Sequence, residues 1–311
     1  MNGIFEVNFA AFSVFAALLI TEIMGAVVLL IAWSAREKVL DYLVPVWEVT
    51  GTFGALWVVT GGFAYPALLV PVSSIFAPLL VVFLIIWVAR SASIAFAEFI
   101  TKSGWLDETK LYRAYSISTL VLGLVVLILL SSLVGGQGVD LGSGSFSLAS
   151  WATAGNILFV VGTLVLGVGM APIFFDLSSI RRFVLPLALA GVAASTLSYW
   201  LMSAELITPW IAIPILLTLA VGLLYHWPKT VRVVTNKAVF LAVLATIIFS
   251  LQPFVYPKVI GQALAVDSVT TAGAMADAFA SITVVGLLLL ALMLAFYLRI
   301  AMRGPSGPDV H

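Results

Sequence analysis

Cysteine is absent from this sequence, and histidine occurs only twice, at His226 and His311. Without cysteine the chain forms no disulfide, no iron–sulfur cluster and no thiolate metal site. A haem held by two imidazoles, or a metal cage, needs several ligands that face one point. Two histidines far apart in the sequence do not supply such a set, so we expect no metal and no haem bound by this chain alone.

Charged residues are also scarce, at 9% of the sequence against about 25% in an ordinary globular domain. Lys and Arg number 14, as do Asp and Glu, which leaves no basic surface for phosphates and argues against a nucleic-acid partner. Hydrophobic residues make up 63% of the chain, and the mean hydropathy is +1.21. We therefore predict a polytopic protein of the cytoplasmic membrane.

Nine segments have the roughly 20 apolar residues that an α-helix needs to cross a bilayer. None shows the alternating hydrophobicity of a lipid-spanning strand, and the first lacks the basic start of a cleavable signal peptide. The fold class is therefore an all-α integral membrane protein, with nine transmembrane helices in two four-helix bundles plus one. The segments cover roughly residues 8–34, 48–70, 73–99, 114–135, 150–175, 183–203, 206–225, 238–260 and 277–300.

Basic residues predict the orientation of these helices, because Lys and Arg stay on the cytoplasmic side of short loops. If the loop after the first helix is inside, thirteen of the fourteen basic residues fall on the inner side and only Lys258 falls outside. The N-terminus is thus predicted outside and the C-terminus inside. The thirteen residues are Arg36, Lys38, Arg90, Lys102, Lys110, Arg113, Arg181, Arg182, Lys229, Arg232, Lys237, Arg299 and Arg303.

A Gly- and Ser-rich stretch, residues 135–149, is the longest outer connection and is typical of a flexible linker. It divides a single polytopic membrane domain, residues 1–311, into helices 1–4 (1–135) and helices 5–9 (150–311). Because all connections are short, we expect any chemistry to occur within the membrane or to come from a partner.

Three local features predict helix boundaries. The charged residues 36–41 indicate a loop, so the second helix should begin near Glu48. A proline-containing hairpin is expected at Val70-Pro71, between the second and third helices. The eighth helix should end or kink at Pro253 and Pro257, because an interior proline breaks the helical hydrogen bonding.

Three of the fourteen acids, Glu22, Glu48 and Glu98, lie outside the loops, tails and outer helix ends that hold the others. Glu22 is near the middle of the first helix, where an ionised acid costs about 2.5–3.5 kcal/mol. It should therefore be protonated, hydrogen-bonded to a neighbouring helix or in contact with water. A structural hydrogen bond, a proton relay and a ligand contact all stay open for it.

Glu48 and Glu98 are expected near the inner ends of the second and third helices, which are adjacent and antiparallel. Arg90 lies about two turns deeper than Glu98 and is the one base expected to be embedded. An embedded guanidinium needs a carboxylate or an anionic cofactor group as its partner.

The stretch Pro45–Pro66 combines an acid with aromatic residues, glycines and threonines at bilayer depth. It resembles the signature P-x-W-D-G-N-(E/Q)-V-W-L, followed by F-A-A-(F/W)-P, of subunit II of the cytochrome bd-type quinol oxidases. Glu48 stands in place of the Asp of that family, and Thr50 in place of its Asn. The residues that match at the family's spacing are Pro45, Trp47, Ala64 and Pro66, with Tyr65 replacing the last aromatic residue.

Three further places resemble the same family. Glu22 with Gly25 falls where the family has D-G-F-D-L-G in its first helix. Arg90 and the following SASIAFAEF, which contains Glu98, resemble the R-G-x-A-x-E-(F/Y) run that closes the third helix. FSLQPFVYP, at residues 249–257, resembles the P-x-x-x-P kink before the last helix.

The resemblance implies a haem-free subunit of a respiratory complex that oxidises quinol and reduces dioxygen to water. In that family, subunit II packs against subunit I, which carries haems b and d-type and the quinol site, so no catalytic residue is expected here. The implied partners are subunit I and the quinone pool, with room for a small single-helix subunit and for a structural quinone or lipid.

The same resemblance associates an acid at the Glu48 position with proton entry from the cytoplasm. The proton-path candidates are therefore Glu22, Glu48 and Glu98, and the supporting residues are Trp47, Thr50 and Arg90.

Two other classes of protein stay open. One is a quinone-interacting membrane anchor of another respiratory complex, of the polysulfide- or nitrite-reductase kind, whose partner is a peripheral iron–sulfur protein. The other is a proton-coupled secondary transporter with Glu22 at the coupling-ion site, which favours paired Gly/Pro interruptions at the midplane. The prolines here are scattered rather than paired. A purely structural scaffold would leave Glu22 replaceable.

Overall fold

The computed structural model describes residues 3–99, 107–202, 212–251, 258–259, 264–265 and 273–303, which are nearly all helical. In chain order the elements are α1 (Gly3–Ile31), the 3-10 helix η1 (Trp33–Ala35), α2 (Arg36–Ala64), α3 (Pro66–Ile75), α4 (Ala77–Phe99), α5 (Glu108–Gly135), β1 (Val139–Asp140), β2 (Ser145–Phe146), α6 (Leu148–Trp151), α7 (Ala154–Phe174), η2 (Ser178–Phe183), α8 (Val184–Met202), α9 (Ala212–His226), α10 (Val231–Val234), α11 (Lys237–Phe249), β3 (Lys258–Val259), β4 (Leu264–Ala265) and α14 (Ala274–Arg303).

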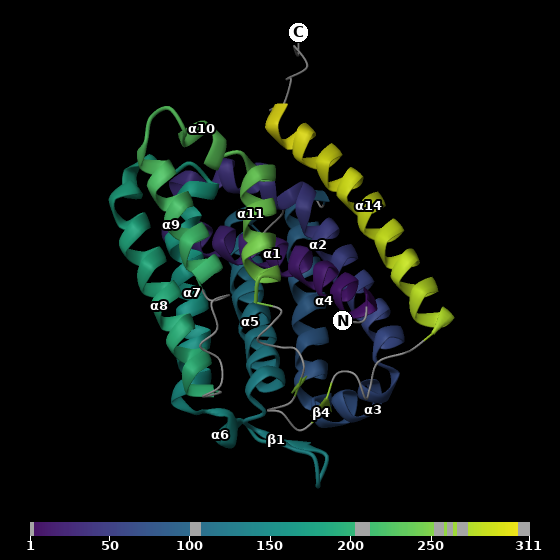
Figure 1. The fold of residues 1–311 in the computed structure, drawn as a ribbon. Coiled ribbons are helices and arrows are strands. Elements are labelled where there is room, and N and C mark those ends of the chain that lie inside the picture. The colour runs from purple at the N-terminus through teal and green to yellow at the C-terminus, as the bar shows by residue number, and fades with distance from the viewer. Residues whose placement is uncertain are drawn as a thin grey trace.

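Within the described ranges, seven helical stretches are long and apolar enough to cross a membrane, so the chain is a multi-pass membrane protein (Figure 1). Each of the nine predicted segments contains a helix. Two of those segments, 206–225 and 238–260, contain the shorter helices α9 and α11, which adjoin residues outside the described ranges. The count of nine spans, their orientation and the division into two bundles therefore stay predictions.

Helix α1 runs through the middle of the bundle, whereas α14 lies along one edge (Figure 1). Of the most apolar window of each helix, 72% is buried in α1 but only 6% in α14 and 11% in α4. The main core cluster joins Leu18 of α1 to Phe174 of α7 and Leu298 of α14. The first helix in the sequence is thus the centre on which helices from both ends of the chain pack.

Helix α2 begins at Arg36, so the predicted loop over residues 36–41 and the predicted helix start near Glu48 are wrong. Glu37 and Asp41 are exposed and lie on the outer face of the first turns. The opposite face is apolar at helical spacing and fully buried, which holds these turns in helical form. Its residues are Val39, Tyr42, Leu43 and Val46.

The hairpin predicted at Val70-Pro71 is also displaced. Pro71 lies inside α3, and the chain turns instead at Phe76. Phe76 is fully buried and packs on Phe146 of β2, with 5.4 Å between ring centroids. The turn thus lies at a buried aromatic contact, five residues beyond the proline. Pro253 and Pro257 lie outside the described residues.

The Gly/Ser-rich stretch 135–149 contains an ordered hairpin. Strands β1 and β2 pair antiparallel, and the Asp140 carboxylate accepts hydrogen bonds from the amides of Gly142 (2.9 Å) and Ser143 (3.2 Å). Gly138 has a φ of 84°, a left-handed conformation that glycine adopts without steric cost. The glycines and serines here build a turn, so this part is not the flexible linker that its composition predicts.

Helix α5 begins at Glu108, earlier than predicted, because Asp107 caps it. The Asp107 carboxylate accepts from the Lys110 amide at 2.8 Å, and the Lys110 ammonium approaches its second oxygen at 2.9 Å. The hydrogen bond from the Lys110 side chain lowers the pKa of Asp107 below its ordinary value.

Helices α7 and α8 pack with their backbones in close contact. A Cβ added to Gly162 of α7 would lie 2.7 Å from the Ser195 amide nitrogen of α8. A Cβ added to Gly191 of α8 would lie 2.4 Å from the Leu166 amide nitrogen of α7. Small residues allow this approach, which is the usual way that helices associate tightly in lipid.

Candidate functional site

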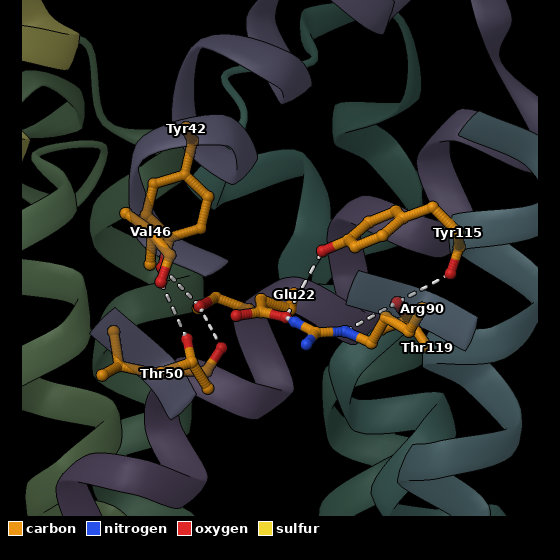
Figure 2. Close-up of polar contacts among 9 residues, drawn as sticks. Glu22, Tyr42, Val46, Thr50, Arg90, Tyr115 and Thr119 are labelled. Carbon is orange, nitrogen blue, oxygen red and sulfur yellow. Dashed lines mark hydrogen bonds and ion pairs between the residues drawn. The ribbon is translucent and has the colours of Figure 1, made fainter. Parts of the chain in front are cut away.

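An ion pair between Glu22 of α1 and Arg90 of α4 forms the polar centre of the bundle (Figure 2). Neither side chain has any exposed surface. Helix α5 completes the group: the Tyr115 hydroxyl donates to Glu22 Oε2 (3.3 Å), and Arg90 Nε donates to Thr119 Oγ1 (3.3 Å). Three helices therefore meet through one buried charged network.

Arg90 is also enclosed by aromatic rings. Its guanidinium carbon lies 5.2 Å from the centroid of the Trp87 ring and 5.3 Å from that of Tyr115. Such cation–π contacts are strongest where water is excluded. Within α4 the buried residues are Arg90, Ile94 and Ala97, which share one face of the helix. The ion pair therefore lies in the narrow contact through which α4 joins the bundle.

A second polar group lies on the α2 side of Glu22. The Tyr42 hydroxyl is 2.6 Å from Thr21 Oγ1, and the fully buried Thr50 hydroxyl donates to the Val46 carbonyl at 3.2 Å. Figure 2 shows Glu22 between this group and the group of Arg90, Tyr115 and Thr119. The carboxylate thus stands at the junction of α1, α2, α4 and α5.

The structure does not bring the three predicted proton-path acids together. Glu22 is in the core, whereas Glu48 is exposed on α2 and pairs with no described residue. Glu98 is at the penultimate position of α4, exposed, and accepts a hydrogen bond from the Tyr112 hydroxyl of α5. Of the supporting residues, Trp47 is half-buried beside Glu48. Arg90 is embedded with a carboxylate partner, as predicted.

Sequence reasoning missed four members of the network: Thr21, Tyr42, Tyr115 and Thr119. One signal for two of them was present, because Tyr115 and Thr119 are polar residues four apart in an apolar helix and therefore share a face. Across the ranges that the structure describes, no three His, Asp or Glu side chains gather in a way that could hold a metal ion.

A cavity of about 440 Å³, separate from this network, is bounded mainly by apolar side chains of α1, α2, α3, α5, α7, α8, α9 and α11. On its wall, Asn8 donates to the Trp57 carbonyl (3.2 Å) and to Thr60 Oγ1 (2.9 Å). Three buried hydroxyls that line the cavity, those of Tyr65, Ser195 and Thr218, have no hydrogen-bond partner among the residues that the structure describes. Volume and lining fit an apolar organic molecule that carries hydrogen-bonding oxygens.

Fold and site together define a class: a polytopic membrane protein with a charged pair in its helical core. A scan against protein-family models and a search of curated proteins find no match. Among solved structures, the chain is similar to a chain of the bd oxidase from Geobacillus thermodenitrificans. The TM-score is 0.72 at 19% sequence identity, and the match covers 97% of this chain and 99% of that chain. The likeness is one of fold, and it extends over nearly the whole length of both chains.

Proposed function

We propose that this chain is the haem-free membrane subunit of a respiratory quinol oxidase of the cytochrome bd type. The observation that carries the proposal is the similarity in fold to a bd oxidase chain over 97% of the sequence. The resemblance of Pro45–Pro66 to the subunit II signature supports it independently, because it rests on residue types rather than on backbone shape. In this role the chain lies in the cytoplasmic membrane and packs against a subunit that carries haems b and d-type.

The surface of the bundle supports a membrane partner. Helices α4 and α14 are the two spans with the least burial, and both expose rows of large apolar side chains. On α4 these include Val81, Ile85 and Val88, and on α14 they include Leu288 and Leu292. Lipid or a second polytopic subunit must cover such faces, and the haem-bearing subunit is the proposed occupant.

Glu48 is the proposed first acid for proton uptake. It lies twelve residues into α2, about 18 Å along the helix from Arg36. Asp41 lies two turns earlier on the same exposed face, which begins at the charged end of the helix. The carboxylate of Glu48 is exposed, whereas that of Glu22 is buried and bound by Arg90. A partner that covers this face would enclose Glu48 but would leave open the path from the charged end of α2, where protons would enter.

Replacing Glu48 by Gln should slow quinol-driven oxygen consumption while the haem content of the complex stays unchanged. A general acid or proton relay typically contributes about 10²–10⁴-fold to a rate, so a loss of at least tenfold is expected. Glu37→Gln is the matched control, since Glu37 is an exposed acid in the first turn of the same helix. Unchanged turnover in the Glu48 variant would remove this residue from the proton path.

The apolar cavity is the proposed site of the structural quinone or lipid. The hydroxyls of Tyr65, Ser195 and Thr218, which have no partner within the described part of the chain, are donors suited to the carbonyl oxygens of a quinone or the ester oxygens of a lipid. The ligand would stabilise the bundle and would take no part in a reaction carried out by this chain.

Gentle purification with an affinity tag on this chain tests the proposal. We expect a second polytopic chain that shows haem absorption, together with quinone or lipid in an organic extract of the same preparation. A small third band would reveal a single-helix subunit. Recovery of a colourless, solitary protein would contradict the proposal. A peripheral iron–sulfur protein in place of the haem-bearing chain would show a membrane anchor of another respiratory complex.

A further inference from the structure

Basic residues gather at one end of the second half of the chain. Between Leu177 and Lys237 the sequence contains a single acid, Glu205, which lies outside the described residues. The same stretch contains five bases, all near helix ends on the side of the bundle where α10 lies, opposite the β1–β2 hairpin (Figure 1). They are Arg181, Arg182, Lys229, Arg232 and Lys237. Because the whole chain has no net charge, this excess of positive charge is local.

Two of the five bases are already bound within the protein. Arg181 of η2 donates a hydrogen bond to the Tyr225 carbonyl at the end of α9, and its guanidinium carbon lies 5.0 Å from the centroid of the Tyr225 ring. The Lys237 ammonium lies 5.3 Å from the centroid of the Tyr42 ring. The first of these contacts fixes η2 against the end of α9, so the bases of these two elements lie close to one another.

The other three bases are exposed, and we call them the basic rim. They are Arg182 of η2, Lys229 in the turn after α9, and Arg232 of α10. None of the three forms an ion pair with any residue in the described ranges. The acids at this end of the bundle act on other groups, since Asp41 interacts with Lys237 and Asp176 interacts with Tyr225. The basic rim is therefore available to an anion from outside the chain.

Each base of the basic rim has a large exposed apolar side chain within two residues of it in the sequence. These side chains are Phe183, Trp227 and Val233, which are 47%, 65% and 55% exposed. The Arg182 guanidinium carbon lies 4.8 Å from the centroid of the Phe183 ring. Exposed bases beside exposed aromatic residues are typical of the level at which lipid headgroups meet their acyl chains.

The surface that adjoins the basic rim is apolar. Helices α8 and α9 pack closely, because a Cβ added to Gly222 would lie 2.9 Å from Leu185. Both helices also expose large apolar side chains, namely Leu189, Leu197, Leu216 and Leu223. Helix α14, one of the two faces proposed for the haem-bearing partner, lies at the opposite edge of the bundle (Figure 1). Acyl chains of lipid are thus the expected cover of α8 and α9.

We propose that this protein binds an anionic phospholipid at the ends of η2, α9 and α10. The headgroup phosphate lies at the basic rim, where guanidinium groups form charge-assisted hydrogen bonds to its oxygens, and the acyl chains lie along α8 and α9. A zwitterionic phospholipid binds less well, because the same bases repel its positively charged amine. The site is separate from the apolar cavity, whose lining contains no residue of the basic rim. It requires neither a quinone nor a haem-bearing partner.

Photo-crosslinking in membranes of defined composition tests the proposal. The complete purified complex is placed in phosphatidylcholine vesicles with a trace of phosphatidylglycerol or phosphatidylcholine that carries a photoreactive group at the start of one acyl chain. Each base should favour the anionic lipid by about fivefold. Labelling of residues 183–189 and 223–227 by phosphatidylglycerol should therefore exceed labelling by phosphatidylcholine by roughly tenfold or more. Equal labelling by the two lipids, or no lipid label at these residues, would overturn the proposal.

Two triple variants separate the basic rim from overall charge. Replacing all three of its bases by Gln should bring labelling by the two lipids to about the same level. The matched control removes three exposed bases from α2 and α5 and should keep the preference for phosphatidylglycerol; it combines Lys38→Gln, Lys110→Gln and Arg113→Gln. An unchanged preference in the first variant, or an equal loss in both, would overturn the assignment to the basic rim.

Inorganic phosphate, added at constant ionic strength, distinguishes a lipid headgroup from a free anion. Labelling by phosphatidylglycerol should persist in its presence, because the acyl chains add apolar contacts that free phosphate lacks. Loss of the label would show a site for free phosphate and would overturn the assignment to a lipid.

Discussion

The buried ion pair predicts an asymmetry between two single substitutions. In Glu22→Gln, Arg90 keeps its charge, because a guanidinium is not deprotonated in proteins. Apart from the amide at position 22, its remaining contacts among the described residues are one hydrogen bond to Thr119 and the rings of Trp87 and Tyr115. Removal of one partner from a buried ion pair lowers the free energy of unfolding by about 3–5 kcal/mol, and the loss in this variant should lie at the upper end of that range.

Arg90→Gln should be the milder change. The carboxylate of Glu22 keeps the Tyr115 hydroxyl as a donor and can take up a proton, so no fixed charge stays in the core. The expected loss is that of an imperfectly satisfied buried polar group, about 1–3 kcal/mol.

The double variant Glu22→Gln with Arg90→Gln separates the charge effect from the rest. With both charges gone, two amides of similar shape replace the pair. The double variant should therefore lose less unfolding free energy than the sum of the two single variants, by about 1–3 kcal/mol. The assay is unfolding of the purified protein in detergent at increasing denaturant, with Glu37→Gln as an exposed control on the neighbouring helix. Additive losses in the double variant would refute the reasoning that mutual compensation of charge holds the pair.

Turnover of the same double variant decides the role of Glu22. If Glu22 only neutralises Arg90, oxygen consumption should recover along with stability. If Glu22 carries protons, stability should recover while turnover stays low, because an amide does not relay a proton in the way that a carboxylate does.

Two further predictions concern the scaffold. Gly191→Val should destabilise the bundle by about 1–3 kcal/mol or more, because a Cβ there would lie 2.4 Å from the Leu166 amide nitrogen. The control Gly167→Ala, whose Cβ would meet only Met24 at 3.9 Å, should change thermal unfolding little. Equal melting temperatures for the two variants would contradict the packing of α7 on α8. The lowered pKa of Asp107 means that its cap stabilises α5 above the ordinary pKa of an aspartate and loses this effect as the pH falls through the lowered value. The melting temperature of the native chain should therefore drop over that acidic range more than that of Asp107→Ala, and parallel pH profiles would disprove the contribution of the cap.

Helix positions could be read from the sequence where local hydropathy alone determines them. Each predicted segment contains a helix, because crossing the bilayer requires about 20 apolar residues in a row. The start of α2 was missed because charged residues at 36–41 obscure a buried face formed by Val39, Tyr42, Leu43 and Val46. A prediction based on the number of charged residues in a segment does not reveal that these charges lie on one side of a helix.

The candidate site was predictable in part. The need of Arg90 for an anionic partner followed from its depth, but the choice of Glu22 did not, since the tilt and spacing of α1 and α4 decide which acid it meets. The exposure of Glu48 depends on which face of α2 packs against α1. The cavity depends on side chains from several helices and has no signature in any single segment.

The central place of α1 has a consequence for the order of assembly. During synthesis Glu22 is made before Arg90, because 68 residues separate the two positions. At about 5–20 residues per second, that interval is roughly 3–14 s. The nascent first helix therefore carries an acid without a counter-charge until the third span is made. Insertion of α4 is then favoured by the acid already in place, and α4 brings a base that the membrane would otherwise resist. We therefore expect the attraction between Glu22 and Arg90 to favour the insertion of α4 next to α1.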